Sequence, residues 1–346
     1  MENLESLAEG LFIKYSHMFL KVADLFKDAS NTAILAELLL FLEKQGRVYV
    51  QRRPVLHNSE LRKDILSQDV VYFGSFPSIK RRTLLYKTGV EYGDYTINHV
   101  LGCAHGCTYP CYAMNISKRY GRVTDYDDWM RPRIVENALE LLENEISKYH
   151  NDMNFVHLSF MTDPFMYDPV NLRNNPWIEN LTLEIIEKLN SHGIKCTVLT
   201  KSKYPTILTQ STYSRDNEYG ITLVSLSPEF HSQYEPYSPE PFERIKSLRN
   251  LHDSGLKTWV SLEPYPTPNI INQDIVEILN RIDFVDKIIF GKWNYSALVN
   301  GYKEQYDFYR ECSDRIIEFA KQKGIPYHIK NKTPRSTQET ETIFRK

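Results

Sequence analysis

The feature that most constrains the fold is an alternation of short β-prone segments with helical patterns, running from Tyr95 to near the C-terminus. Such alternation predicts parallel strands joined by right-handed helical crossovers. About six units of this kind predict an α/β fold built as a partial or full barrel. The predicted strands are Tyr95–Leu101, Asn154–Phe160, Lys195–Thr200, Gly220–Leu226, Thr258–Leu262, Lys287–Phe290 and a short Tyr327–Lys330; the predicted helices are Pro132–Tyr149, Ile178–His192, Pro241–Gly255, Asn272–Arg281 and Gln305–Gly324.

Polar side chains follow the predicted strands at their C-terminal ends. Thr162 and Asp163 follow the second strand, Lys201 the third, and Ser225 and Ser227 the fourth. Because α/β barrels place their chemistry at this rim, we expect these side chains to converge there. Hydroxyls, a carboxylate and a lysine predict a polar pocket for a charged ligand.

Three of the five cysteines lie within nine residues, directly after the first predicted strand: Cys103, Cys107 and Cys111. Thiolates on so short a loop point toward a common centre, as at a metal or cluster site. Three cysteines leave one iron of a four-iron cluster open to a small molecule. With His105, the same loop is alternatively a Cys₃His zinc site. His105 is otherwise interpreted as a loop residue that hydrogen-bonds near the cluster.

Composition narrows the class of protein. The chain has 346 residues, of which 42% are hydrophobic, and this length is enough for one large or two smaller domains. A net charge of −2 means that any nucleic-acid contact must come from a local patch. The apolar run 34–42 is too short to span a bilayer, and no leader is visible, so we expect a cytoplasmic location without membrane contact. Clustered cysteines in a reducing compartment indicate metal, whereas Cys196 and Cys312 are expected to be ordinary buried or helical residues.

The part of the chain before the barrel is divided into a helical extension, 1–57, and a connector packed on the core, 58–92; the barrel with its C-terminal helix and strand takes 93–346. Helical spacing covers Leu4–Phe26, and Asn31 caps a second helix that continues to Leu42. A short strand follows over 47–53. This order is either a helical cap on the main domain or a winged-helix-like module that reads nucleic acid.

The cysteine loop, with an aromatic residue after its third cysteine, resembles the radical S-adenosylmethionine superfamily. More narrowly, the chain resembles the spore photoproduct lyase-like branch, often labelled DNA repair photolyase-like. The resemblance covers about residues 95–266, and the order and spacing of its pieces are more specific than the cysteines alone. The matching pieces are Cys103-Ala104-His105-Gly106-Cys107 with Cys111-Tyr112-Ala113, then Thr162-Asp163-Pro164, then Val198-Leu199-Thr200-Lys201-Ser202, then Tyr234-Glu235-Pro236 with Ser238-Pro239 and Phe242-Glu243-Arg244-Ile245.

This resemblance implies a partial (β/α)6 TIM-like barrel of the radical SAM type. It implies a [4Fe–4S] cluster on Cys103, Cys107 and Cys111, with S-adenosylmethionine chelating the open iron. An external electron donor, flavodoxin- or ferredoxin-like, would drive reductive cleavage of the cofactor to a 5′-deoxyadenosyl radical. That radical would abstract a hydrogen from the substrate, while the protein binds and orients the reactants.

The resemblance also implies roles for individual residues around S-adenosylmethionine. Thr162 matches a position near the methionine part, and Lys201 matches a lysine that pairs with the carboxylate. Ser225 or Ser227 matches a serine near the ribose or carboxylate, and Tyr112 would pack near the adenine. Asp163 belongs to the same cofactor-binding set, although an aspartate before a proline also organises turns or acts as an acid.

Two departures from the family pattern stand out. Three residues, Thr108-Tyr109-Pro110, separate the second and third cysteines where the family has two, and Pro110 restricts the loop so that it is expected to bulge. Met161 occupies the position of the hydrogen-donating cysteine of spore photoproduct lyases. The resemblance therefore extends to the radical-generating scaffold and not to cleavage of a thymine dimer.

Three function classes remain. Nucleic acid is the first substrate class by resemblance, supported by basic clusters at 52–53, 80–82 and 118–119 with nearby tyrosines. A protein or peptide is the second, with the N-terminal extension as recognition module. The third class is a non-enzymatic iron–sulfur or zinc-binding regulatory protein, which has no need for Lys201 at the rim. Glu235 either anchors substrate or fixes the following helix.

Overall fold

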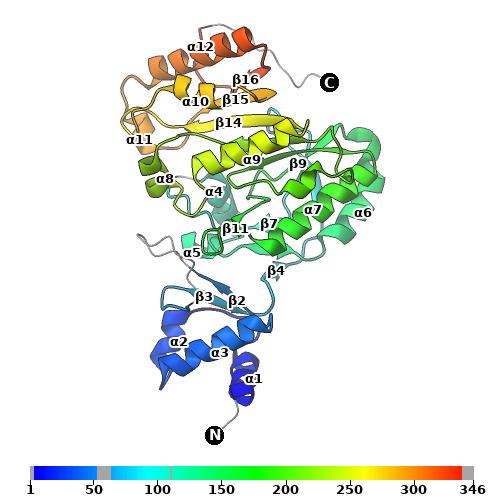
Figure 1. Ribbon diagram of the computed structural model, residues 1–346, viewed down its shortest axis with the longest axis vertical. Coiled ribbons are helices and arrows are strands. Elements are labelled where there is room, and N and C mark those ends of the chain that lie inside the picture. Colours follow the sequence, from blue (N-terminus) through cyan, green and yellow to red (C-terminus); the bar gives the residue numbers. More distant parts are fainter. Residues whose placement is uncertain (1–3, 53–63, 110, 337–346) are drawn as a thin grey trace.

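The chain builds a large parallel sheet with a smaller unit at its N-terminal end (Figure 1). The computed structural model describes residues 4–52, 64–109 and 111–336. Every neighbouring pair from β6 to β16 is parallel, and β5 adds an antiparallel edge. The sheet order is β16 (Tyr327–Ile329), β15 (Lys287–Lys292), β14 (Lys257–Tyr265), β13 (Glu218–Thr222), β12 (Lys195–Thr200), β9 (Phe155–Leu158), β6 (Tyr95–Ile97) and β5 (Leu85–Lys87).

Helices fill the crossovers between the parallel strands, as the alternation predicts, except between β12 and β13, where the chain forms only a short 3-10 helix, Thr206–Thr209. Asn175 begins α7 by accepting hydrogen bonds from the first-turn amides, and Gly324, at φ +67°, ends α12. Buried aliphatic side chains of the helices, such as Ile185 and Leu189, join Val198 of β12 in one core. The helices are α6 (Ala138–Tyr149), α7 (Pro176–Ser191), α9 (Pro241–Asp253), α10 (Ile275–Arg281) and α12 (Gln305–Lys323).

The strand order follows the chain order, which is how (β/α) units are arranged in a barrel. In the described part of the chain no pairing joins β5 to β16, so the sheet is open at its two ends. The fold is therefore mixed α/β around a large parallel sheet, as predicted. The candidate site lies at the carboxyl ends of its strands.

Two predicted elements differ from the structure. The strand predicted over Tyr95–Leu101 splits into β6 and β7 (Val100–Leu101), because the buried polar side chains of Asn98 and His99 interrupt it. The helix predicted from Pro132 begins only at α6, since β8 (Arg133–Val135) comes first. Strands β7 and β8 pair with β4 (Ser78–Ile79) in a small second sheet.

The N-terminal unit combines three helices with a three-stranded antiparallel sheet ordered β1-β3-β2. Its own core includes Leu39, Leu42, Val71 and Phe73. The helix predicted over Leu4–Phe26 is interrupted by β1, which pairs with β3. The element order matches the winged-helix-like alternative: α1 (Leu4–Tyr15), β1 (Phe19–Lys21), α2 (Val22–Asp28), α3 (Thr32–Lys44), β2 (Val48–Gln51) and β3 (Val70–Phe73).

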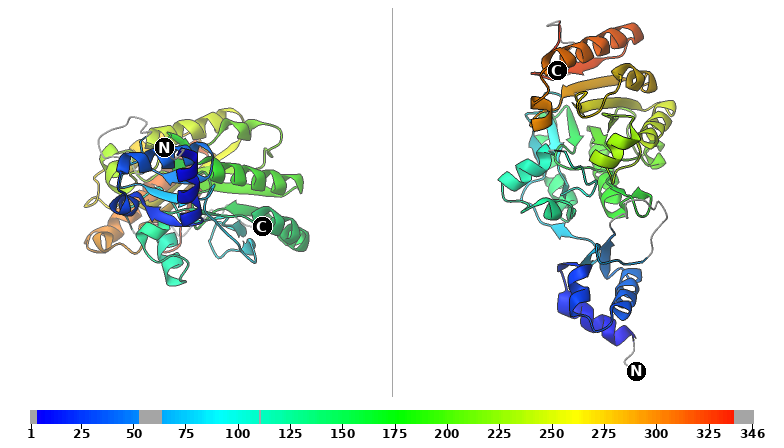
Figure 2. Two further views of the ribbon diagram at one scale, coloured as in Figure 1. Left: turned by 90° about the horizontal axis from the view of Figure 1, so that it is seen from below. Right: turned by 90° about the vertical axis from the view of Figure 1, so that its left-hand side faces the viewer.

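The N-terminal unit projects from one end of the main body, as the right view of Figure 2 shows. Strand β3 lies within the predicted connector yet pairs with both β1 and β2. Within the described residues, no helix has the length and hydrophobicity needed to cross a lipid bilayer. The remaining elements are short: α4 (Tyr112–Arg119), α5 (Tyr126–Trp129), β10 (Tyr167–Asp168), β11 (Arg173–Asn174), α8 (Pro228–Tyr234) and α11 (Ala297–Asn300).

Candidate functional site

The cysteine loop follows β7, and two glycines let it pass close to its neighbours. Gly102 has φ +89°, and a Cβ there would lie 2.6 Å from the carbonyl oxygen of Trp129. Gly106 has φ +66°, and a Cβ there would lie 2.4 Å from the ring of Tyr237. Only glycine combines these backbone conformations with such close packing. The loop is therefore fixed from both sides.

The three loop cysteines are free thiols, not joined in disulfides. Burial raises the pKa of each, and the neighbouring Cys107 raises the pKa of Cys103 further. Each is thus a neutral thiol that must lose its proton to bind a metal. Among the described residues, no three His, Cys, Asp or Glu side chains are already gathered closely enough to hold one metal ion.

His105 supports the loop through both of its ring nitrogens. Its Nε2 accepts a hydrogen bond from the amide of Tyr167 at 2.8 Å, and its Nδ1 lies 3.6 Å from Oδ2 of Asp163. Burial lowers the pKa of His105 to about 4, so the ring is neutral. These contacts favour the interpretation of His105 as a loop-supporting residue over that of a zinc ligand.

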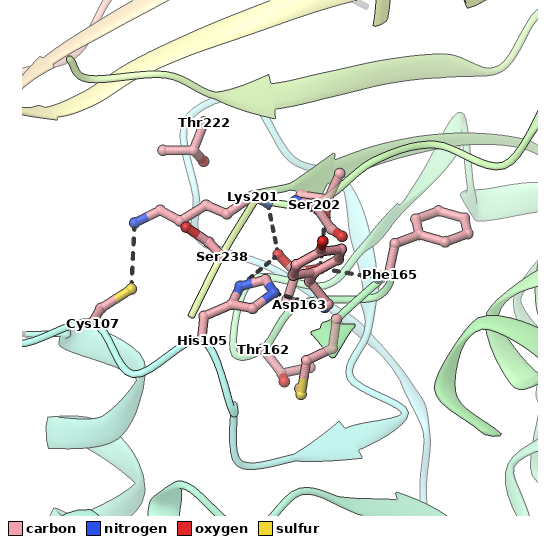
Figure 3. A network of polar contacts seen from close by, with 12 residues as sticks. His105, Cys107, Thr162, Asp163, Phe165, Lys201, Ser202, Thr222 and Ser238 are labelled. Carbon is pink, nitrogen blue, oxygen red and sulfur yellow. Dashed lines mark hydrogen bonds and ion pairs between the residues drawn. The ribbon is translucent and has the colours of Figure 1, made fainter. Parts of the chain in front are cut away.

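Asp163 is the hub that joins this loop to the central strands (Figure 3). Its Oδ1 accepts hydrogen bonds from the hydroxyl of Thr200 at 2.6 Å and the amide of Phe165 at 3.0 Å. Its Oδ2 accepts from the amide of Lys201 at 2.7 Å. The carboxylate is therefore saturated by groups that hold the turn and the end of β12.

Lys201 reaches from the end of β12 to the cysteine loop (Figure 3). Its Nζ lies 2.9 Å from Oε1 of Glu235, 3.8 Å from Sγ of Cys107 and 4.4 Å from the ring centre of Tyr109. Oε2 of Glu235 lies 2.6 Å from Nη2 of Arg244. Buried Arg244 and partly buried Lys201 thus share the carboxylate of Glu235, and Asp163 places a second negative charge near Cys107.

Glu235 fixes the following helix, which is one of the two roles expected for it. Burial by itself raises its pKa, but Arg244 and Lys201 outweigh burial and hold the pKa of Glu235 at about 2. Arg244, in the first turn of α9, also donates to the carbonyls of Pro239 at 2.8 Å and Thr222 at 3.2 Å. Removing either partner would leave an uncompensated buried charge.

The other predicted residues make contacts nearby without joining this network. Thr162 donates to the carbonyl of Gly102 at 2.5 Å, and Tyr112, 46% exposed, donates to the carbonyl of Phe160. Ser225 accepts from the amide of Ser227, whose own hydroxyl accepts from the first turn of α8. No hydrogen bond between described residues joins either serine to Lys201. The predicted bulge at position 110 falls on a residue outside the described ranges.

Sequence reasoning missed two members of the network. Arg244 and Tyr109 both contact Glu235, the latter by donating a hydrogen bond of 2.9 Å. The motif pieces contain Glu235 and Arg244, but their spacing does not reveal that they pair. Cys196 and Cys312 are buried in β12 and α12, as expected.

The chain is similar in sequence to two proteins of archaeal and viral origin. No protein-family model matches the chain. An uncharacterised protein of Acidianus two-tailed virus is 28% identical over 231 residues, covering 61% of this chain and 72% of that protein. An uncharacterised protein of Methanocaldococcus jannaschii is 24% identical over 263 residues, covering 71% of this chain and 93% of that protein.

Among solved structures, the chain is similar to spore photoproduct lyase. A variant of that lyase with bound AdoMet and dinucleoside spore photoproduct has a TM-score of 0.52 and 15% identity, covering 72% of this chain and 80% of that one. The lyase complexed with dinucleoside spore photoproduct has a TM-score of 0.51 and 14% identity, with coverages of 72% and 81%. The predicted resemblance is thereby confirmed at the level of the fold.

Proposed function

We propose that this chain is a radical S-adenosylmethionine enzyme whose sheet is a partial (β/α)6 barrel of that type. The observation that carries the proposal is Lys201, a partly buried lysine at a strand end with its Nζ 3.8 Å from Sγ of Cys107. Three cysteines on one loop, followed by a cation at the rim, supply both a cluster site and a partner for a carboxylate. A purely structural metal site needs no such cation.

Cys103, Cys107 and Cys111 would hold the [4Fe–4S] cluster, and the rim residues would hold S-adenosylmethionine. When bound, the pair supplies a 5′-deoxyadenosyl radical for hydrogen abstraction. The residues present fit these groups: the thiols are not engaged in disulfides, and the Lys201 ammonium lies 3.8 Å from Sγ of Cys107. An ammonium group at this position suits a charge-assisted hydrogen bond to a ligand carboxylate.

Each rim residue has a role in this proposal. Lys201 binds the carboxylate of S-adenosylmethionine, and Glu235 with Arg244 positions the lysine. Thr162 and Asp163 hold the loop and strand ends in register beside the cofactor, and Tyr112 covers the adenine. Ser225 and Ser227 border the ribose. Met161 stands where spore photoproduct lyases have a cysteine that donates a hydrogen atom. Methionine cannot donate in that way, so a different product is expected.

We propose nucleic acid as the substrate class. This proposal rests on the family resemblance and on one basic surface at the end of α4. Lys118 and Arg119 end α4 next to Tyr120, which is 69% exposed. Within the described residues no ion pair engages either cation. Exposed aromatic rings beside free cations suit single-stranded nucleic acid. By contrast, the predicted basic residue Arg52 is paired with Glu43.

Metal content tests this proposal. The full chain is reconstituted anaerobically with iron, sulfide and an equal concentration of zinc, and its metals are measured. About four irons per chain and a visible iron–sulfur absorbance are expected, with both lost in Cys107→Ala. One zinc and no iron per chain would contradict the proposal and favour the regulatory metal-binding protein.

A further inference from the structure

The segment that follows Cys107 is anchored to the main body. The amide of Thr108 donates to the carbonyl of Tyr234 at 3.1 Å, and its hydroxyl donates to the carbonyl of Gln233 at 2.7 Å. Both acceptors lie at the end of α8. The next residue, Tyr109, is only 7% exposed. The longer spacing between the second and third cysteines therefore includes a buried tyrosine with a fixed backbone neighbour.

The hydroxyl of Tyr109 and the ammonium of Lys201 bind the same carboxylate oxygen. Oε1 of Glu235 accepts a hydrogen bond from the Tyr109 hydroxyl at 2.9 Å and lies 2.9 Å from Nζ of Lys201. The other oxygen, Oε2, lies 2.6 Å from Nη2 of Arg244. A buried polar network whose members are satisfied is rigid. Tyr109 thus helps to fix the oxygen that holds the ammonium.

The ring of Tyr109 contacts the same ammonium. Nζ of Lys201 lies 4.4 Å from the ring centre, within the range of a cation–π interaction. Trp293, which follows β15 and is 3% exposed, packs edge-on against this ring with ring centres 5.1 Å apart. The buried tryptophan restricts the tyrosine ring, and the ring in turn restricts the ammonium.

These contacts leave Lys201 able to bind a further acceptor. An ammonium has three N–H donors, and the contacts with Glu235 and with Sγ of Cys107 occupy two directions. A lysine on a flexible four-carbon stem loses conformational freedom when it binds a ligand. A lysine that is already held in place loses less, and this difference strengthens binding.

We propose that Tyr109 is a positioning residue that holds the Lys201 ammonium where it binds the carboxylate of S-adenosylmethionine. This inference rests on the proposed function, in which Lys201 is the carboxylate partner. It gives the three-residue spacing between Cys107 and Cys111 a role, because a side chain from this spacer serves the cofactor site.

The test compares two ligands that differ only in the carboxylate: S-adenosylmethionine and decarboxylated S-adenosylmethionine. Titration calorimetry on the full-length, reconstituted protein without reductant gives the affinity for each ligand. The ratio of the two affinities reports carboxylate recognition, because damage elsewhere in the site weakens both ligands alike. Iron content is measured on every sample.

Tyr109→Leu removes the hydroxyl and the ring, so we expect the affinity ratio to fall about tenfold. Tyr109→Phe keeps the ring, and the ratio should fall only about threefold. In a Lys201→Met background, Tyr109→Leu should lower the ratio no further, because Tyr109 acts through the lysine.

Tyr234→Leu is the matched control. The Tyr234 ring also packs against Trp293, with ring centres 6.1 Å apart. Among the described residues, no hydrogen bond or ring contact joins Tyr234 to Lys201. The affinity ratio of this variant should equal that of the wild type.

An unchanged ratio in Tyr109→Leu, or an equal fall with and without Lys201, would overturn the positioning role. If Tyr109→Leu loads less iron, Tyr109→Phe decides the question, and an unchanged ratio in that variant would overturn the proposal. A lower ratio in Lys201→Met but not in the Tyr109 variants contradicts only the role of Tyr109. Equal binding of both ligands by the iron-loaded wild type contradicts the proposed function and this inference together.

Discussion

At the scale of single residues, Lys201 is the side chain on which the proposed cofactor site depends. Lys201→Ala is expected to weaken S-adenosylmethionine binding about tenfold to a hundredfold, because a charge-assisted hydrogen bond contributes about 1.5–3 kcal/mol. Isothermal titration on the reconstituted protein measures this. Lys203→Ala, two residues along and paired with Glu243 at 3.5 Å, is the control. Equal affinity of both variants would show that Lys201 does not bind the carboxylate.

His157 gives a residue-scale prediction about pH. It is fully buried in β9 and stacked on Phe160 with ring centres 3.7 Å apart, and among the described residues neither of its ring nitrogens has a hydrogen-bond partner. Burial lowers the pKa of His157 to about 3, from the ordinary histidine value of 6.5. Between these values the unfolded chain binds a proton that the folded chain does not, so folding stability falls as pH falls.

Removing the imidazole should remove that part of the pH dependence. Between pH 7 and pH 5 the contribution of His157 amounts to about 2 kcal/mol, from the linkage of proton binding to unfolding. Urea unfolding measures the free energy of unfolding at both pH values. When the pH is lowered from 7 to 5, this free energy should fall by about 2 kcal/mol less for His157→Phe than for the wild type. An unchanged difference between the two pH values would mean that His157 is protonated in the folded protein.

The placement of site residues was predicted best where residue type and strand-end position select them, and their roles stay predictions. Cys103, Cys107 and Lys201 were identified from residue type and position, and the structure places Lys201 beside Cys107. Arg244 was not identified, because a buried arginine in a helix is recognised only through its partner. That partner, Glu235, lies nine residues earlier, beyond the reach of helical periodicity.

At the scale of elements, the cysteine loop depends on the space at Gly106. In Gly106→Ala the new Cβ would meet the Tyr237 ring at 2.4 Å, so the loop is expected to shift and iron binding to fall severely. Gly121→Ala is a matched control, since its φ of +64° imposes the same backbone strain but nothing lies within 4 Å. That strain costs about 1 kcal/mol.

Iron content and thermal unfolding distinguish the two glycine variants. We expect Gly121→Ala to keep the iron content of the wild type and to lose only a little stability. If Gly106→Ala also bound iron normally, the close approach of the loop to Tyr237 would have no functional consequence.

Elements were predicted well where periodicity is uninterrupted. The strand Lys195–Thr200 has the predicted bounds, because a β-prone run lies between a helix end and a polar strand end. The segment 95–101 was predicted as one strand, although Asn98 and His99 break it. His99 is buried and its Nε2 lies 2.7 Å from the Thr182 hydroxyl, a tertiary contact that no local pattern announces.

At the scale of the whole molecule, the N-terminal unit and the main body have separate cores. Leu39→Ala should destabilise the N-terminal unit by about 2–5 kcal/mol, and Leu189→Ala should destabilise the main body by a similar amount. Hydrogen exchange should rise in β2 and β3 for the first variant, and in α7 and β12 for the second. Equal increases in both regions for both variants would show one cooperative unit.

The α/β class of the molecule followed from its alternating pattern, whereas the N-terminal sheet was harder to predict. Strand β3 pairs with β1 across about 50 residues. Pairing over such a separation depends on tertiary packing, and the strands themselves are only three and four residues long. The winged-helix-like arrangement was therefore only one of two alternatives at the sequence level.

The central claim, that this fold generates a radical from S-adenosylmethionine, is tested most directly by product analysis. The reconstituted protein is incubated anaerobically with S-adenosylmethionine and dithionite, and 5′-deoxyadenosine is quantified by mass spectrometry. We predict 5′-deoxyadenosine from the wild type and none above background from Cys107→Ala. Its absence from iron-loaded wild type, or equal formation by Cys107→Ala, would contradict the claim.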